Sequence, residues 1–267
     1  MPETDVERYL DAVVHVTRDV LGAAFAGAYA AGSLALNAFQ PGRSDIDLAL
    51  LCHSPLDEPV KHALIARLRH GTLPCPARGL ELVVYTVATA RSGTAEPGFE
   101  LELNEGPAMA FRQSLRPVDR PAADGTFWYG LDRSILHSSG RVLAGPPASR
   151  AFADIPPDRL RNLLIDSLSW WMAQPHLADG RPAPGVDDAV LGACRALVRH
   201  REGRWLSKVD AGRRLLEAGY RPAVTAQQAG TITQALAART GGPPPSGRQA
   251  RTFQDGVLQE IRPAPGP

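Results

Sequence analysis

The sequence predicts an α+β (α/β-type) fold in two parts: a domain with a small mixed sheet, followed by a domain made only of helices. Two observations carry this prediction. Apolar runs of strand length alternate with helical patterns over the first half of the chain, whereas later apolar residues recur only at helical spacing. The proline-rich stretch LAGPPASRAFADIPPD lies between the two patterns and is typical of an inter-domain linker. We therefore predict domains over residues 1–153 and 154–240, and a Pro/Gly-rich tail over 241–267 that is poorly ordered at its start.

The elements of the first domain follow from local patterns. Apolar residues recur at helical spacing from Leu10 to Leu21, so the chain opens with a helix. Apolar runs and, in FELELN, the alternation of apolar and polar residues predict strands over 24–31, 46–52, 80–87 and 99–104. Helical patterns cover residues 34–39, 59–69 and 131–138.

The second domain opens with a strong helical pattern, the apolar stripe of Leu160, Leu163, Leu164 and Leu168. Further helices are predicted over 189–201, 208–218 and 222–239. A sheet domain followed by a helical domain suggests a cleft between them, which is a common place for ligands.

Composition excludes several classes of protein. The chain has 267 residues, 44% of them hydrophobic, and a formal net charge of +1, so it lacks the basic excess of a nucleic-acid-binding protein. Its three cysteines, Cys52, Cys75 and Cys194, have no metal-ligand spacing and fit a reducing compartment. We see no signal peptide and no apolar run near the ~18 residues that span a membrane. The sequence predicts a soluble, cytoplasmic protein that binds neither nucleic acid nor membrane; its oligomeric state stays open.

Two acids in the segment Ser44-Asp45-Ile46-Asp47 are the strongest functional signal. Side chains at i and i+2 of a strand project from the same face, so Asp45 and Asp47 lie together while Ile46 points into the sheet packing. Like charges so placed repel each other unless a cation lies between them. Because Mg²⁺ prefers carboxylate and phosphate oxygens, we predict a magnesium site at Asp45 and Asp47.

A glycine-serine turn and a third acid complete this predicted site. Gly32 allows close backbone approach, and the helix that follows it presents free N–H groups to an anion. The Ser33 hydroxyl adds one more donor, so the turn predicts a phosphate-binding element beside the metal. Glu81, inside the strand LELVV, supplies a further carboxylate as general base or as part of the metal shell.

The order of these motifs resembles a known family. Gly-Ser, a loop, Asp-x-Asp and an acid on a later strand are similar to the nucleotidyltransferase superfamily that includes DNA polymerase β. The stretches LDRSILHSSGRVLAGPPASRAF, DRLRNLLIDSLSWW and AVLGACRALVRHREGRWLSKVDAGRRLLE resemble the aminoglycoside adenylyltransferases of the streptomycin/spectinomycin type. This resemblance covers residues 25–240 and implies a nucleotidyltransferase domain followed by a helical bundle.

The resemblance implies an activity: magnesium-dependent transfer of AMP from ATP to a hydroxyl of an aminoglycoside or aminocyclitol, with release of pyrophosphate. It implies that Asp45 and Asp47 hold the magnesium. Glu81 matches the position of the family's catalytic base.

The resemblance also implies nucleotide contacts. Ser33 and Ser44 would contact the triphosphate next to Gly32. Arg195 and Lys208 match basic residues of the helical domain that reach ATP, although a solvated basic face would explain them as well.

A cationic acceptor needs acidic side chains around it. The acids available for this role are Glu100, Glu102, Asp187 and Asp188. An exposed strand edge and a pair of acids at a helix N-terminus explain the same residues almost equally well. Gly106 falls where streptomycin-modifying members carry a tryptophan, so we predict that spectinomycin is preferred over streptomycin.

Two alternatives remain open at this stage. The same chemistry could act on another hydroxylated metabolite or on a protein side chain. A non-catalytic regulator that binds a nucleotide is disfavoured, because a degenerate member of the family would be free to lose its three acids.

Overall fold

The computed structural model describes residues 3–178 and 180–263. The chain divides into two compact units, Met1–Pro156 and Pro157–Pro267. The sequence predicts this boundary between residues 153 and 154. We describe the first unit and the helical unit separately.

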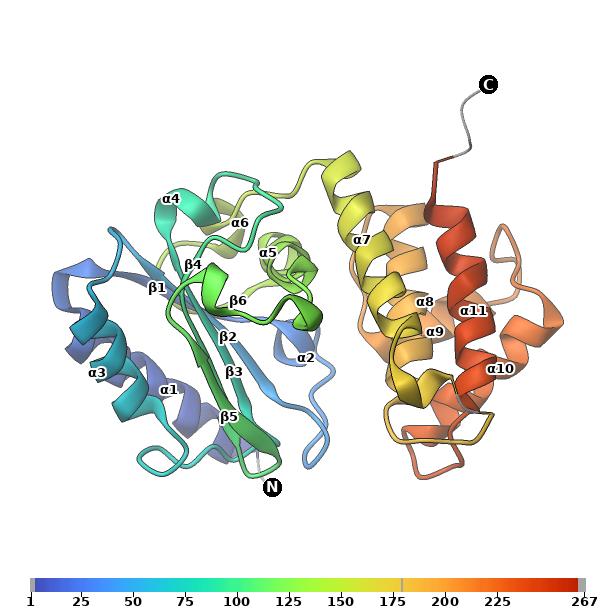
Figure 1. Ribbon diagram of the computed structural model, residues 1–267, viewed down its shortest axis with the longest axis horizontal. Helices are drawn as coiled ribbons and strands as arrows, with labels where there is room; N and C mark the ends of the chain where they lie inside the picture. The colour runs from blue at the N-terminus through green and yellow to red at the C-terminus, as the bar shows by residue number, and fades with distance from the viewer. Residues whose placement is uncertain (1–2, 179, 264–267) are drawn as a thin grey trace. The chain divides into compact units, whose positions relative to one another are not determined.

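A six-stranded mixed sheet forms the first unit, in the order β5-β4-β3-β2-β1-β6 (Figure 1). The strands are β1 Phe25–Ala30, β2 Ile46–Cys52, β3 Leu80–Thr86, β4 Phe99–Gly106, β5 Met109–Ser114 and β6 Arg141–Ala144. β2 and β3 are parallel, whereas the other neighbours pair antiparallel. The predicted strands are confirmed as β1 to β4. The prediction missed β5 and β6, because short edge strands bury little and so carry few apolar residues.

Helices cover both faces of this sheet (Figure 1). They are α1 Glu3–Leu21, α2 Gly32–Ala35, α3 Glu58–Leu68, α4 Val87–Ala90, α5 Phe127–Ser139 and α6 Ala148–Ala151. On one face, Leu10 of α1 and Leu64 of α3 pack in a core with strand residues such as Leu82. On the other face, Tyr129 of α5 packs in a second core with Tyr85 of β3. The row of polar residues that contains Asp47 and Glu81, described below, belongs to this second face.

The boundary between the two units lies inside the predicted linker LAGPPASRAFADIPPD, but most of this stretch is folded into the first unit. The first residues of the stretch end β6, and α6 lies within it. Ala148, Ala151 and Phe152 are buried, and the Phe152 ring meets the Tyr29 ring edge-on with 5.1 Å between centroids. The prolines stand at the borders of α6, where they are tolerated, and the small and aromatic residues between them bury a core surface.

The helical unit is built from α7 Pro157–Met172, α8 Val186–Glu202, α9 Lys208–Leu216, α10 Ala226–Ala238 and α11 Gly247–Ile261. α8 packs against each of the other four helices. The predicted helices are confirmed as α7 to α10. The apolar stripe of Leu160, Leu163, Leu164 and Leu168 is buried as predicted.

The prediction of a poorly ordered tail over 241–267 is wrong for its described part. Ser246 caps α11 in a capping box with Gln249. Phe253, Val257 and Ile261 are buried at helical spacing on one side of α11, which packs against α7 and α8. The stretch GGPPPSGRQ hides this helix because its prolines and glycines precede the cap, where they do not interrupt helical hydrogen bonds.

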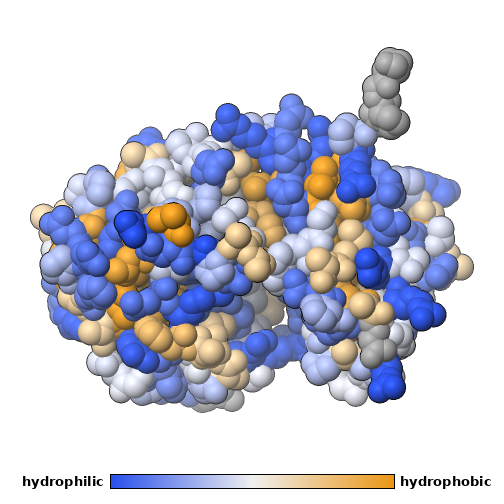
Figure 2. Space-filling model, in the orientation of Figure 1, coloured by the Kyte–Doolittle hydropathy of each residue, from blue (hydrophilic) through white to orange (hydrophobic). Residues whose placement is uncertain are grey.

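Within the described residues, no helix combines the length and apolar character needed to cross a membrane. Hydrophilic side chains are spread over the visible face of each unit, with hydrophobic ones in small groups between them (Figure 2).

Candidate active site

Four polar residues form one row across the sheet. The strand register places Asp47 of β2 beside Glu81 of β3, Glu81 beside Asn104 of β4, and Asn104 beside Arg112 of β5. The row lies on the α5 face, because Ala49, two residues after Asp47, belongs to the core that contains Tyr129. The sheet thus brings the predicted acids Asp47 and Glu81 together with Asn104 and Arg112, for which the sequence predicts no role in the site.

Gly32 makes room for the carboxylate of Asp47. The chain turns directly after β1, where the Ala31 N–H donates to the Asp47 carbonyl oxygen at 2.9 Å. Gly32 has φ +50°, and a β-carbon on it would lie 1.7 Å from Asp47 Oδ2. Any other residue would be strained in this conformation and would displace the carboxylate. This close approach supports the predicted pairing of the Gly32-Ser33 turn with the acids of β2.

The Ser33 hydroxyl is a buried polar group without a partner. Its Oγ is inaccessible to water and has no hydrogen-bond partner among the residues described. Burying an unsatisfied hydroxyl is unfavourable by about 1–3 kcal/mol. A phosphate oxygen beside the turn would satisfy it.

Ser44 stabilises the loop that leads to Asp45. Its Oγ accepts from the Gln40 N–H at 3.0 Å, and its own N–H donates to the Gln40 carbonyl at 2.8 Å. The structure therefore gives Ser44 a role in shaping the loop; the predicted contact with the triphosphate stays a prediction.

Glu81 is the acid of this row with a raised pKa. Part of the Glu81 side chain is accessible to solvent. The protein atoms packed around it nevertheless reduce the hydration of its carboxylate. This burial, followed by the negative charges of Asp45 and Asp132, raises the pKa of Glu81 to about 7, and the positive charge of Arg112 opposes the rise. A carboxylate that titrates near neutral pH suits a general base.

The donor set fits magnesium held together with a nucleotide. Across the described ranges, no group of three or more His, Cys, Asp or Glu side chains is placed to hold a metal ion by itself. Magnesium usually takes one or two carboxylates and fills its other positions with phosphate oxygens and water. Asp45 and Asp47 flank the fully buried Ile46, and the Asp47 carboxylate lies against Gly32, the residue before the unsatisfied Ser33; these features match that arrangement.

Glu100 lies on the other face of the sheet from Glu81. In a regular strand Glu100 and Glu102 would lie on one face, but the β3–β4 register shifts between Val84 and Tyr85 and leaves Glu100 in the irregularity. Its Oε2 lies 3.3 Å from Lys61 Nζ and accepts from the Leu56 N–H at 3.1 Å.

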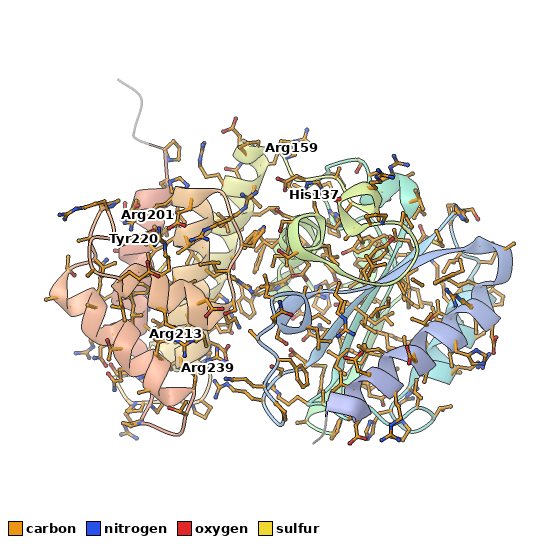
Figure 3. The ribbon with its side chains drawn as sticks, turned by 180° about the vertical axis from the view of Figure 1, so that it is seen from behind. His137, Arg159, Arg201, Arg213, Tyr220 and Arg239 are labelled. Carbon is orange, nitrogen blue, oxygen red and sulfur yellow. The ribbon has the colours of Figure 1, made fainter. Side chains whose placement is uncertain are left out.

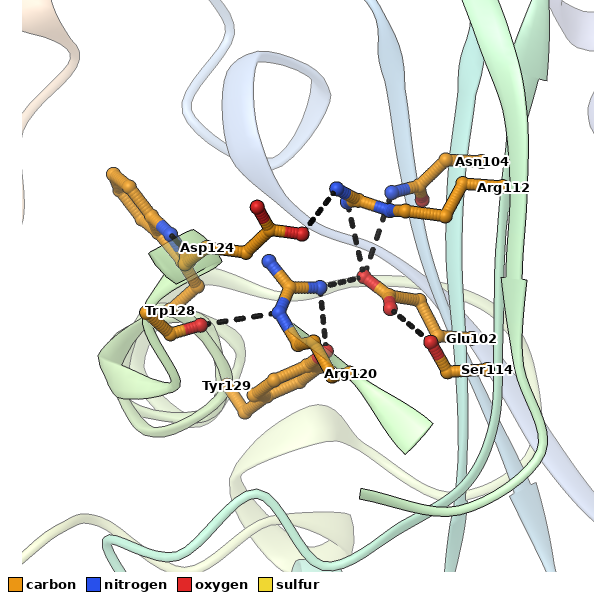
Figure 4. A network of polar contacts seen from close by, with 9 residues as sticks. Glu102, Asn104, Arg112, Ser114, Arg120, Asp124, Trp128 and Tyr129 are labelled. Atoms are coloured by element: carbon orange, nitrogen blue, oxygen red, sulfur yellow. Dashed lines mark hydrogen bonds and ion pairs between the residues drawn. The ribbon is translucent and has the colours of Figure 1, made fainter. Parts of the chain in front are cut away.

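Glu102 lies on the face of Glu81 but is buried, with 4% of its surface exposed. Arg120 and Arg112 form ion pairs with it, and the Ser114 hydroxyl donates to its Oε2 at 3.2 Å (Figure 4). Both of its oxygens are therefore engaged within the protein.

Asp187 and Asp188 open α8 and form an ion cluster within the helical unit. Arg239, at the end of α10 (Figure 3), lies 3.2 Å from Asp187 through Nε and 2.5 Å from Asp188 through Nη2. Lys208 Nζ donates to the same Asp188 oxygen at 2.7 Å. Burial would raise the pKa of Asp188, but Lys208 and Arg239 outweigh it and hold that pKa well below its usual range.

Arg195 and Lys208 both have contacts within the helical unit. The Arg195 guanidinium lies 5.9 Å from the centre of the Trp205 ring, and Lys208 is held by Asp188. Their role toward ATP stays a prediction.

Sequence reasoning missed four residues that matter to these sites. Asn104 and Arg112 complete the row of Glu81, Asp132 contributes to its acidity, and Arg239 joins Asp187 to Asp188. An arginine in a short edge strand carries no local signal for its partner. Asp132 could have been noticed as an acid inside an otherwise apolar helical pattern.

Comparison with known proteins shows the fold. No family model matches the chain, and no curated protein matches it. Among solved structures, it is similar to a spectinomycin adenyltransferase from Enterococcus faecialis, determined with ATP and spectinomycin. The TM-score is 0.67 at 15% sequence identity, over 95% of this chain and 98% of that one. The chain therefore shares the fold of that structure, a mixed-sheet domain followed by a helical domain, which is the architecture that its sequence predicts.

Proposed function

We propose that the protein is a magnesium-dependent O-adenylyltransferase, which transfers AMP from ATP to a hydroxyl of a small aminocyclitol and releases pyrophosphate. The observation that carries this proposal is the approach of the Asp47 carboxylate to Gly32, in a row shared with Glu81. This arrangement sets a carboxylate, a phosphate-binding turn and a base side by side. A purely structural acid pair would not require a glycine in this position.

The chemistry requires little covalent work from the protein. Asp45 and Asp47 would hold magnesium, which would neutralise charge on the phosphate groups when bound. Ser33 would donate its hydroxyl to a phosphate oxygen. Glu81, with a pKa of about 7, is partly deprotonated near neutral pH and would accept the proton of the attacking hydroxyl.

The acceptor is the less determined half of the reaction. The predicted acceptor acids, Glu100, Glu102, Asp187 and Asp188, each pair with a cation of the chain. An acceptor with many ammonium groups would have to compete with these partners. A small aminocyclitol such as spectinomycin needs fewer acidic contacts than a three-ring aminoglycoside, and the similar adenyltransferase structure was determined with spectinomycin. We therefore keep spectinomycin ahead of streptomycin.

Pyrophosphate release tests the proposal. The purified protein is incubated with ATP and magnesium and, separately, with spectinomycin, streptomycin and the uncharged cyclitol myo-inositol, and Asp45→Ala serves as control. We expect release with spectinomycin, less with streptomycin, and none from the control. Release only with myo-inositol would favour a neutral metabolite as acceptor. ATP binding without release from any acceptor would support the non-catalytic regulator instead.

A further inference from the structure

A buried ion pair lies next to the row that contains Glu81. Glu102 pairs with Arg120, and the side chains are only 5% and 6% exposed. Arg120 also donates from Nη1 to the Tyr129 hydroxyl at 2.7 Å and from Nε to the Gly125 carbonyl at 3.1 Å (Figure 4). Because Arg120 compensates the charge of Glu102, this pair can persist when other partners are removed.

Arg112 connects this pair to the row. Its Nη2 lies 3.4 Å from Glu102 Oε1, and its Nη1 donates to Asp124 Oδ2 at 3.0 Å. The side chain is 40% exposed, far more than Arg120. Arg112 is therefore a second, more accessible cation in this network, and the burial of Glu102 does not depend on it alone.

Arg112 also sets the orientation of Asn104. A guanidinium can only donate hydrogen bonds, so the Asn104 amide must turn its oxygen toward it. In this orientation Arg112 Nη2 donates to the amide oxygen at 2.6 Å, and the amide nitrogen donates to the Leu103 carbonyl at 3.0 Å. Both ends of the amide are then satisfied without Glu81, although Glu81 is its direct neighbour across the strands.

We propose that Arg112 is a positioning residue for Glu81, which acts by holding the Asn104 amide in hydrogen bonds that do not involve the Glu81 carboxylate. This inference rests on the proposed function. Without Arg112, the amide can rotate and donate to Glu81 across the strand pair, where facing side chains are within contact distance. That hydrogen bond would draw the carboxylate from the Asp47 side of the row and occupy the oxygen that accepts the proton.

The test compares Arg112→Met with a matched control, Arg116→Met. Arg116 lies just beyond β5, is 70% exposed and pairs with Asp119, so its removal should not affect turnover. We expect Arg112→Met to lower kcat by about 10- to 100-fold, since a misplaced catalytic group has effects of this size. The KM for ATP should stay within about two-fold, because the change does not touch the phosphate-binding turn.

Two further variants separate positioning from structure. Arg112→Met/Asn104→Ala removes the competing amide, so kcat should recover relative to Arg112→Met. Arg112→Lys restores the charge beside Asn104 and should also recover part of the activity. Folded enzyme is counted by the stoichiometry of ATP binding in calorimetry, and if Arg112→Met does not fold, Arg112→Ala, which also removes the donor to Asn104, replaces it with the same expectation.

Each outcome decides the inference. A kcat of Arg112→Met equal to that of the unmodified protein overturns the positioning role while the proposed function stands. A loss of kcat that neither the double variant nor Arg112→Lys relieves also overturns it. Failure of the unmodified protein to release pyrophosphate with every acceptor overturns the proposed function, and this inference falls with it.

Discussion

In two clusters of acids in this chain, the pKa of one member is shifted in opposite directions: upward for Glu81 and downward for Asp188. In the first unit, burial and the charges of Asp45 and Asp132 raise the pKa of Glu81 to about 7. In the helical unit, Lys208 and Arg239 hold the pKa of Asp188 well below its usual range. Glu81 is therefore harder to ionise than a free glutamate, and Asp188 is easier to ionise than a free aspartate.

The difference separates Glu81, which we propose as a general base, from Asp188, whose ionised form is paired within the fold. A carboxylate whose ionised form is paired contributes to folding stability, because the folded state favours its charge. A carboxylate surrounded by like charges makes folding less favourable at neutral pH, and proteins retain such groups where chemistry requires them. Asp188 belongs to the first kind, and Glu81 belongs to the second.

The largest expected effect is on the proposed base. Glu81→Gln should lower turnover by about 10²- to 10⁴-fold, because the amide cannot accept a proton. Calorimetric titration of magnesium and ATP should show an affinity within a few-fold of normal. Parallel loss of affinity and turnover would instead place Glu81 in the metal shell.

Asp47→Asn should lower turnover by about 10²- to 10³-fold, since it removes charge from the proposed metal site while keeping the side-chain shape next to Gly32. Far-UV circular dichroism should remain unchanged. Near-normal turnover of the folded variant at saturating magnesium would contradict the site assignment.

Removing the paired acid should lower stability. Asp188→Asn should reduce the free energy of unfolding at pH 7 by about 1–3 kcal/mol, because Lys208 and Arg239 lose a charged partner. The folded-state pKa lies well below the unfolded value of 3.8, so this contribution is fully present above about pH 4 and is lost progressively as the pH falls from there toward the folded-state pKa. Urea unfolding at pH 7 and at pH 3 measures it. Asp158→Asn, in an exposed pair with Arg161, is the control and should change little.

Replacing Glu81 should raise the stability of the protein at alkaline pH, whereas replacing Asp188 should lower it at pH 7. The folded-state pKa of Glu81 is raised, so its contribution to stability is greatest below its ordinary pKa of 4.5 and is lost as the pH rises through about 7. Glu81→Gln should therefore be more stable than the unmodified protein at pH 8, and this gain should vanish near pH 4.5. Melting temperatures across this range test the sign, and a loss of stability at pH 8 would contradict the comparison.

The smallest effect is expected from Lys208→Ala. Asp188 keeps Arg239 as a partner, so the free energy of unfolding should fall less than in Asp188→Asn. If Lys208 also contacts a phosphate, as its sequence position implies, the affinity for ATP should fall by less than about ten-fold. Unchanged ATP affinity would leave Lys208 with its structural pairing alone.

Local sequence patterns were enough to predict most of the regular elements of this protein, but not the edge strands β5 and β6 or the helix α11. The strands β1 to β4 and helices α7 to α10 follow from apolar periodicity, which depends only on neighbouring residues. Strand alternation and the nearby glycine identified Asp47 and Gly32. Glu81 stood out as an acid in an apolar run.

The tertiary structure determines which charged side chains form ion pairs. Because of one register irregularity in β4, Glu100 and Glu102 lie on opposite faces of the sheet. Glu100 forms an ion pair with Lys61, and Glu102 forms one with Arg120. Arg239 reaches Asp187 from a helix far along the chain. Such partners are selected by chain closure and burial rather than by local propensity, because a buried charge must find its counterion wherever the fold places one. The sequence could therefore indicate where acids cluster, and only the three-dimensional arrangement could show which of them are neutralised.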